Sequence, residues 1–137
     1  MDPSSSDSIG SDFVLQATLE NPSLRPNVIS GEPVESKLVL YSDRFTEIGI
    51  WEVTPGSFPA SKDGVCELMQ FVAGSATIVD ANGETTVEPG VVMFLPDGWT
   101  GTWTVRETVR KTYALHHTRS RVRRGVAAVA RRVRRRL

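Results

Sequence analysis

Residues 90–98 read Gly-Val-Val-Met-Phe-Leu-Pro-Asp-Gly, and they carry the clearest structural signal in this chain. An apolar run rich in β-branched and aromatic residues ends at Pro96-Asp97-Gly98, which fits a tight turn, and a second such run follows. The same alternation of runs and Gly or Pro breaks extends from Val34 to His116. Candidate strands are residues 36–41, 46–53, 66–73, 76–80, 85–87, 91–95, 99–106 and 109–116. Eight short antiparallel strands must close on themselves to hide their edges, so we predict an all-β barrel or jelly roll.

One turn is specified in detail by the sequence. Asp80-Ala81-Asn82-Gly83 contains an Asn-Gly step, and these two residues adopt positive φ at little cost. We therefore expect a hairpin between the fourth and fifth candidate strands, with Asn82 and Gly83 as its central residues.

The 137 residues suffice for one domain, and the composition divides the chain into three parts. Residues 1–12 are rich in Ser, Asp and Gly and are expected to be disordered, and Phe13 to Pro26 is interpreted as a helical turn or an extended strap. We predict a flexible N-terminal arm and strap (1–27), a barrel (28–116) and an Arg-rich extension (117–137).

The extension gives the chain a strong charge asymmetry. All sixteen acidic residues lie at or before Glu107, whereas nine of the sixteen basic residues lie from Arg119 onward. Val122, Val126, Val129 and Val133 recur at helical spacing, which predicts a basic amphipathic helix. Such a helix binds anionic membranes or nucleic-acid phosphates. The alternatives are a solvated tail, or docking on the acidic body or on a neighbouring subunit.

Several classes of protein are excluded. The lone Cys66 cannot form an intrachain disulfide, and the acidic, polar start lacks the features of a signal peptide. No apolar stretch is long enough to span a membrane, so we expect a cytoplasmic protein, and we also expect a homodimer. His116 and His117 are the two histidines of the chain, which rules out a metal site built mainly on imidazoles.

Two spaced motifs resemble those of the cupin superfamily. The first runs from Gly49 to Phe58 and continues to Glu67 and Gly74, and the second runs from Gly90 through Pro96-Asp97-Gly98 to Tyr113. The second motif looks in particular like the small cupins grouped with ureidoglycine aminohydrolase and the ethanolamine-utilisation cupins. The resemblance covers about Val28 to Leu115 and implies a jelly-roll β-barrel.

The metal ligands of metal-binding cupins are largely missing from this sequence. These cupins use two His in an H-x-H group, a Glu in the first motif and a His in the second; carried over by position, only Glu67 matches. The H-x-H positions fall within Ala60-Ser61-Lys62-Asp63, and the second-motif His position falls on Gly101. One carboxylate cannot hold a transition metal, so we predict no bound metal and no cofactor.

Glu67 therefore needs another partner. Strand alternation puts Glu67, Met69 and Phe71 on one face, which the resemblance directs to the barrel interior, where an unpaired carboxylate is costly. Lys111, on the same face of the last strand as Tyr113, is the available cation, and we predict that it takes the place of the metal. The alternative is a carboxylate that simply hydrogen-bonds to backbone or water.

Aromatic residues gather around the two motifs, where they fill the core or form a pocket wall. Trp103, which shares its strand face with Gly101, is the preferred wall residue. The full set of candidate ligand-binding residues is Trp51, Phe58, Met69, Phe71, Trp99 and Trp103. Cys66 points to the opposite face from Glu67 and is interpreted as a buried, inert thiol.

Three functions remain open at this point. The first is a cupin that binds a small polar metabolite in the barrel without a metal. The second is a hydrolase, isomerase or lyase that uses Glu67 as general base, with Lys111 or Tyr113 as its electrostatic partner. The third is an interaction module that acts through the Arg-rich tail.

Overall fold

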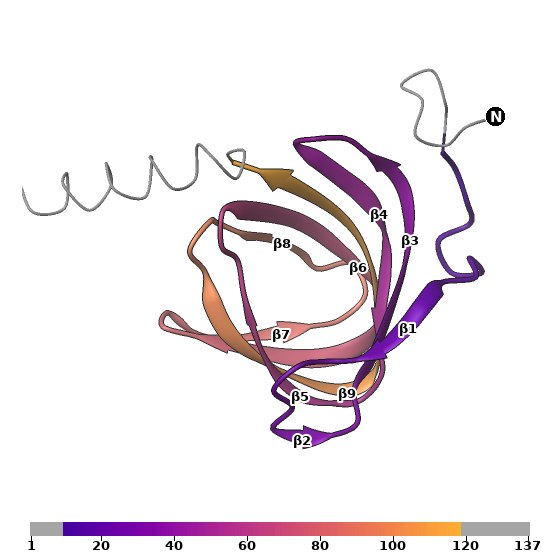
Figure 1. Ribbon diagram of the computed structural model, residues 1–137. Helices are drawn as coiled ribbons and strands as arrows, with labels where there is room; N and C mark the ends of the chain where they lie inside the picture. Colours follow the sequence, from indigo (N-terminus) through magenta and orange to yellow (C-terminus); the bar gives the residue numbers. More distant parts are fainter. Residues whose placement is uncertain (1–9, 119–137) are drawn as a thin grey trace, which may run out of the picture.

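The computed structural model describes residues 10–118, which form nine strands and no helix (Figure 1). The strands are β1 (Glu20–Leu24), β2 (Ser30–Gly31), β3 (Val34–Ser42), β4 (Thr46–Val53), β5 (Gly56–Ser61), β6 (Val65–Asp80), β7 (Gly83–Val87), β8 (Val92–Leu95) and β9 (Thr100–His117). The prediction of an all-β domain is confirmed. The expected arm at residues 1–9 and the expected helix after residue 118 lie outside the described residues.

Strand β9 is the centre of the architecture. Its first part pairs with β5, its second part pairs with β4, and β6 runs antiparallel to it along nearly its whole length. The sheet continues outward as β1-β3-β4 on one side and as β5-β2 on the other, while β7 and β8 pair with β6. The strongly curled sheet makes two layers that face each other as a jelly-roll barrel (Figure 1).

The two longest strands bend where the sequence analysis placed a break. Predicted strands 66–73 and 76–80 form the single strand β6, and 99–106 and 109–116 lie in β9, with the register shifting between Phe71 and Ala76. Gly74 in this bulge has φ 88°, and a β-carbon there would overlap the carbonyl oxygen of Thr108. The bulge lets each strand continue from one layer into the other without losing its partner.

Three strands were not predicted. Segment 13–26 has a turn closed by the Ala17 N–H bonding to the Phe13 carbonyl, but it then forms β1, which pairs with β3, so part of the expected strap belongs to the sheet. Strand β5 contains Pro59, and proline is more typical of loops than of strands. Proline is tolerated here because β2 pairs only with the beginning of β5 and leaves Pro59 with one neighbouring strand.

The predicted hairpin is present, but its turn is displaced by one residue. Asp80 pairs with Gly83, so the central residues of the β6–β7 turn are Ala81 and Asn82. Gly83 follows them with φ 121°. Gly83 therefore directly follows the two central residues of the turn and is not one of them.

The core occupies the inner faces of both layers. In β6, Met69 and Phe71 are buried whereas Leu68 is exposed, as the alternation predicted. Beyond the bulge Ile78 is buried and Val79 is exposed, because the register shift between Phe71 and Ala76 exchanges the inward parity of the strand. Trp103 lies at the centre of an aromatic cluster: its ring stacks on Phe58 and contacts Trp51 edge-on, with centroid separations of 5.9 and 5.7 Å.

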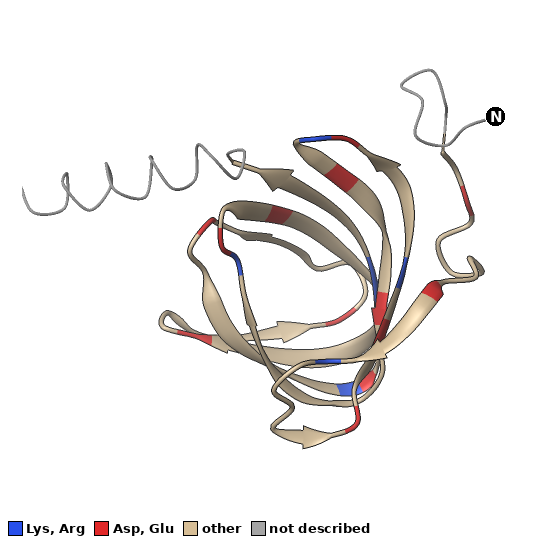
Figure 2. Ribbon diagram, viewed as in Figure 1, with Lys and Arg blue, Asp and Glu red and all other residues tan. Residues whose placement is uncertain are grey.

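Charged residues are unevenly represented in this part of the chain. Residues 10–118 contain fourteen Asp and Glu but seven Lys and Arg, and Figure 2 shows the acidic positions spread over many strands and loops. Arg110 pairs with Glu52 and also donates to the carbonyls of Val14 and Ala17, which fastens the N-terminal segment to the sheet. Among the described residues, no helix is long and apolar enough to cross a membrane.

The bulge predicts a difference between two glycine substitutions. Gly74→Ala and Gly90→Ala both impose a side chain on positive φ, 88° and 99°, which costs about 1–2 kcal/mol. Only Gly74 has backbone in the way, because no atom lies within 4 Å of a β-carbon at Gly90. Gly74→Ala should therefore lower the free energy of unfolding in urea clearly more than Gly90→Ala; equal losses would contradict the steric role of the bulge.

Candidate ligand-binding site

A cavity of about 200 Å³ lies inside the barrel. Its wall comes from β3, β4, β5, β6, β8 and β9, together with the segments around Arg25 and Lys62. The polar and charged residues that line it are Arg25, Glu35, Lys37, Glu47, Ser61, Lys62, Glu67, Lys111 and Tyr113. The aromatic residues Trp51, Phe58 and Trp103 and the small or aliphatic residues Ala60, Leu95 and Leu115 complete it.

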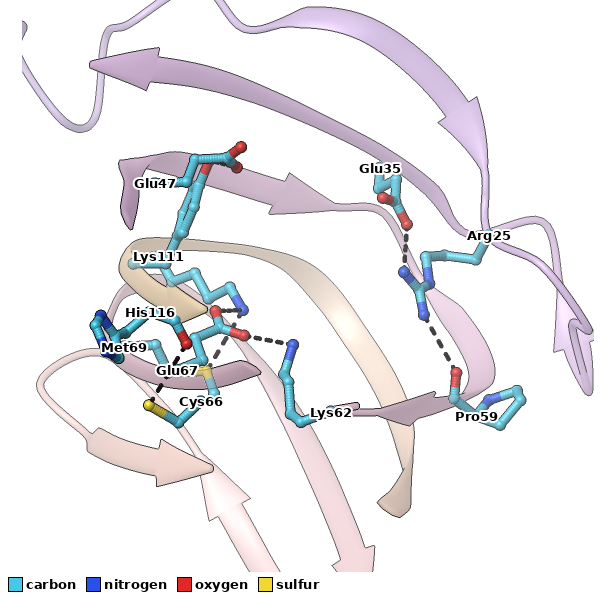
Figure 3. A network of polar contacts seen from close by, with 11 residues as sticks. Arg25, Glu35, Glu47, Pro59, Lys62, Cys66, Glu67, Met69, Lys111 and His116 are labelled. Carbon is cyan, nitrogen blue, oxygen red and sulfur yellow. Dashed lines mark hydrogen bonds and ion pairs between the residues drawn. The ribbon is translucent and has the colours of Figure 1, made fainter. Parts of the chain in front are cut away.

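The central feature of the cavity is a carboxylate held between two lysines (Figure 3). Glu67 Oε2 lies 2.7 Å from Lys111 Nζ, and Glu67 Oε1 lies 2.6 Å from Lys62 Nζ. The side chains of Glu67 and Lys111 are 4% and 6% exposed, and that of Lys62 is 19% exposed. We call these three residues the ion triplet.

Each member of the triplet has a structural origin. Glu67 is on β6 and Lys111 on the adjacent β9, where Lys111 pairs with Phe71 and both side chains point inward. Lys62 lies in the loop after β5, and its backbone is fixed by bonds to the loop before β9: its N–H donates to the Trp99 carbonyl and its carbonyl accepts from Gly98. The predicted contact between Glu67 and Lys111 is present.

Lys62 as a second partner was missed. It lies among the four residues that span the H-x-H positions of metal-binding cupins. This location could have indicated that it lies near Glu67. Sequence alone did not show which of these residues would face Glu67, because the loop has no strand alternation to fix its side-chain directions.

Lys111 is surrounded on all sides. Besides Glu67, its Nζ contacts Met69 Sδ at 3.4 Å and lies over the rings of Trp51 and Trp103, 4.4 and 5.2 Å from their centroids. Indole faces attract ammonium groups, so these rings stabilise the buried cation in addition to the carboxylate.

The triplet shifts the pKa of two of its members. Burial raises the pKa of Glu67, but the charges of Lys111 and Lys62 outweigh it and hold that pKa below its usual value. Burial lowers the pKa of Lys111, and the attraction of Glu67 offsets only part of this effect. Glu67 is therefore a fixed anion at neutral pH.

Tyr113 belongs to a neighbouring pair. Its hydroxyl donates to Glu47 Oε2 at 2.8 Å, and Glu47 also pairs with Lys37 Nζ at 2.9 Å. Burial and this carboxylate raise the pKa of Tyr113 well above its usual value, so the phenol stays protonated. All three predicted catalytic residues line the same cavity, but Tyr113 is bonded to Glu47 rather than to the triplet.

The N-terminal segment contributes a third ion pair. Arg25 bonds to Glu35 at 2.6 Å and to the carbonyl of Pro59, and its guanidinium lies 4.7 Å from the centroid of the Phe58 ring (Figure 3). Four further lining residues were not predicted from the sequence: Arg25, Glu35, Lys37 and Glu47. They reach the cavity because β1, β3 and β4 pair side by side in the folded sheet.

The predicted ligand-binding residues separate into two groups. Trp51, Phe58 and Trp103 line the cavity. The others do not border it: Met69 lies against Lys111, Phe71 packs on Trp103 at 5.9 Å between centroids, and Trp99 donates its indole N–H to Asp80. Cys66 is half-buried rather than buried, and its thiol lies 3.8 Å from the His116 carbonyl.

The side chains at the family's metal-ligand positions do not fit a metal ion. Each oxygen of Glu67 is in an ion pair with an ammonium group. The H-x-H positions fall within Ala60-Ser61-Lys62-Asp63, which contains no histidine, and the second-motif position holds Gly101, which has no side chain. Within residues 10–118, no group of three or more His, Cys, Asp or Glu side chains is placed to hold a metal.

Residues 41–113, more than half of the chain, match the model of the EutQ-like cupin domain. The chain belongs to this family. The matched part includes all of β6, β9 as far as Tyr113, and all three members of the ion triplet.

Solved structures agree with the assignment to the cupin fold. A protein of unknown function from Pseudomonas syringae is 31% identical with a TM-score of 0.64; the match covers 73% of this chain but only 45% of that one. The EutQ protein of Clostridium difficile is 17% identical (TM-score 0.55, 63% and 70% covered). A predicted oxalate decarboxylase from Thermotoga maritima is 14% identical (TM-score 0.57, 77% and 96% covered). The last two show a common fold. No curated protein matches this sequence.

The triplet predicts unequal effects of removing its members. Glu67→Gln leaves two facing ammonium groups without a counterion and should cost about 3–5 kcal/mol of unfolding free energy. Lys111→Met should cost clearly less, because Glu67 keeps Lys62, and the double variant should recover part of the Glu67→Gln loss. Urea denaturation of the wild type, the two single variants and the double variant measures these losses.

The control is Lys37→Met, which removes one partner of a half-exposed ion pair and should cost at most about 1 kcal/mol of unfolding free energy. Strictly additive losses at positions 67 and 111 would show that the two side chains do not interact.

The lowered pKa of Glu67 predicts that the Glu67→Gln penalty depends on pH. The carboxylate's contribution is complete above the ordinary Glu pKa of about 4.3 and is lost as pH falls through the lower folded-state value. The stability difference between wild type and Glu67→Gln should therefore be constant near neutrality and should shrink at acid pH. Urea denaturation at a series of pH values tests this; a difference that grows on acidification would contradict it.

Proposed function

We propose that this cupin binds a small polar metabolite inside its barrel and does so without a metal ion. The observation that carries the proposal is the cavity, whose wall combines charged and aromatic groups. The charged groups are the ion triplet and the pairs Arg25–Glu35 and Lys37–Glu47, and the aromatic groups are the rings of Trp51, Phe58 and Trp103. Apolar walls with a few placed polar groups are typical of small-molecule sites.

The size of the cavity limits the ligand. At about 200 Å³ it exceeds the ~150 Å³ of a cavity that admits benzene, but it is smaller than the ~300–1,000 Å³ of pockets for drug-sized molecules. A metabolite of roughly one ring or a short chain fits this range.

The ion triplet supports binding without a metal. Two ammonium groups supply the positive charge beside Glu67 that a divalent cation supplies in a metal-binding site, and they occupy both carboxylate oxygens. A metal would have to displace both lysines and would then find one protein ligand, whereas stable sites use three or more.

The enzyme alternative has less support. A general base needs a pKa near the working pH. Both oxygens of Glu67 are in ion pairs and its pKa is lowered, and Tyr113 is a protonated donor to Glu47. The interaction function of the Arg-rich tail concerns residues outside the described range. Together with the homodimer and the cytoplasmic location, it stays a prediction.

A ligand screen tests the proposal. Small carboxylates, ureides and sugars are added to the full-length protein, and a bound one should raise the melting temperature, with about 2.7 kcal/mol of stabilisation at a concentration of 100 Kd. The shift should be unchanged by EDTA. A panel without any hit, or a hit that disappears on chelation, would contradict the proposal.

Two matched substitutions localise the hit. Ala60→Leu adds volume inside the cavity and should abolish the shift, whereas Ala114→Leu adds the same volume on β9 away from the lining and should keep it. A shift that persists in Ala60→Leu would place binding outside the barrel.

A further inference from the structure

The basic residues of the described chain are concentrated around the cavity. Of the seven Lys and Arg between residues 10 and 118, four line it, whereas only three of the fourteen Asp and Glu do. The four basic lining residues are Arg25, Lys37, Lys62 and Lys111. The cavity is thus positively charged inside a domain whose described residues carry a net negative charge (Figure 2).

The pairing of these groups leaves one positive charge over. Arg25 is matched by Glu35, and Lys37 by Glu47. Glu67 alone serves both Lys62 and Lys111. An uncompensated charge in a largely buried site is costly, and one external negative charge would remove the imbalance.

The unmet hydrogen-bonding groups point the same way. Among the described residues, the buried side-chain nitrogen and oxygen atoms without a partner are Arg25 Nε and Trp103 Nε1. Both residues line the cavity, and both atoms are N–H donors that cannot accept. Buried donors without acceptors are rare, and here two residues of the cavity wall each have one buried donor for which the described protein supplies no acceptor.

Lys62 is the member of the triplet best placed to meet a ligand. Lys111 is enclosed by Glu67, Met69 and two indole rings, whereas Lys62 has the more exposed side chain. Its backbone is held by the loop before β9, and its ammonium is held by the ion pair with Glu67.

We infer that the metabolite bound in the cavity is a small monocarboxylate whose carboxylate group pairs with the ammonium of Lys62. A carboxylate has two oxygens and about four acceptor sites, which suits an ammonium and N–H donors together. Phosphate carries up to two charges and exceeds the single excess cation. The inference rests on the proposed function, since it names the ligand class of the same cavity.

Pairs of acid and amide with the same shape test the inference. Propionate and propionamide, lactate and lactamide, and benzoate and benzamide are added to the full-length protein at neutral pH, with inorganic phosphate alongside. At least one acid should raise the melting temperature and give a saturable heat of binding, and its amide should not.

The outcomes distinguish the carboxylate inference from the more general proposal that the cavity binds a small metabolite. If amides, ureides or sugars bind as well as the acids, or phosphate binds better, the carboxylate inference is overturned while binding in the cavity stands. If no compound of any class binds, both are overturned.

Two charge-matched variants locate the contact. Lys62→Gln removes the excess cation and leaves Glu67 paired with Lys111, so the protein should stay folded while the Kd of the acid rises roughly ten- to hundredfold. Arg106→Gln removes the same charge from an exposed position outside the cavity and should leave the Kd unchanged. Equal weakening by both variants would show that only net charge matters and would overturn the assignment to Lys62.

Discussion

Strands β6 and β9 pair along almost their whole length, and both pass from one layer of the barrel to the other at the same bulge. Every other part of the sheet attaches to this pair: β4 and β5 to β9, and β7 and β8 to β6. The pairing also sets Glu67 and Lys111 on adjacent strands with their side chains inward. The cavity chemistry thus depends on one antiparallel register, because a slip of one strand by one residue would turn its side chain outward and separate Glu67 from Lys111.

Inside that frame, the electrostatics follow from desolvation. A carboxylate that is 4% exposed cannot remain ionised without partners, and here two lysines supply them, one from a strand and one from a loop. The indole rings around Lys111 lower the cost of burying its charge further. The cavity is therefore lined by one more basic than acidic residue, and two of its wall residues have a buried N–H donor without an acceptor.

Much of the fold was predictable from local patterns. The alternation in residues 66–71 correctly placed Met69 and Phe71 on one face, which is buried, and the Gly and Pro breaks correctly located the strand ends around Pro96. Where prediction failed, tertiary context had overridden local preference. Strands β1 and β5 each contain a proline, Pro22 and Pro59, and both form because a neighbouring strand offers an edge to pair with.

The sequence by itself determined the all-β class, the inward face of β6, the resemblance to small cupins, and the replacement of most metal-ligand positions by residues that do not bind metals. It also identified Lys111 as the partner of Glu67, since strand alternation fixes side-chain direction over short distances. Only the tertiary structure decided that Lys62 joins them and that Arg25 reaches the cavity. These residues lie in a loop and beside a short edge strand, where no periodicity constrains direction, and their positions follow from long-range backbone pairing that no local pattern encodes.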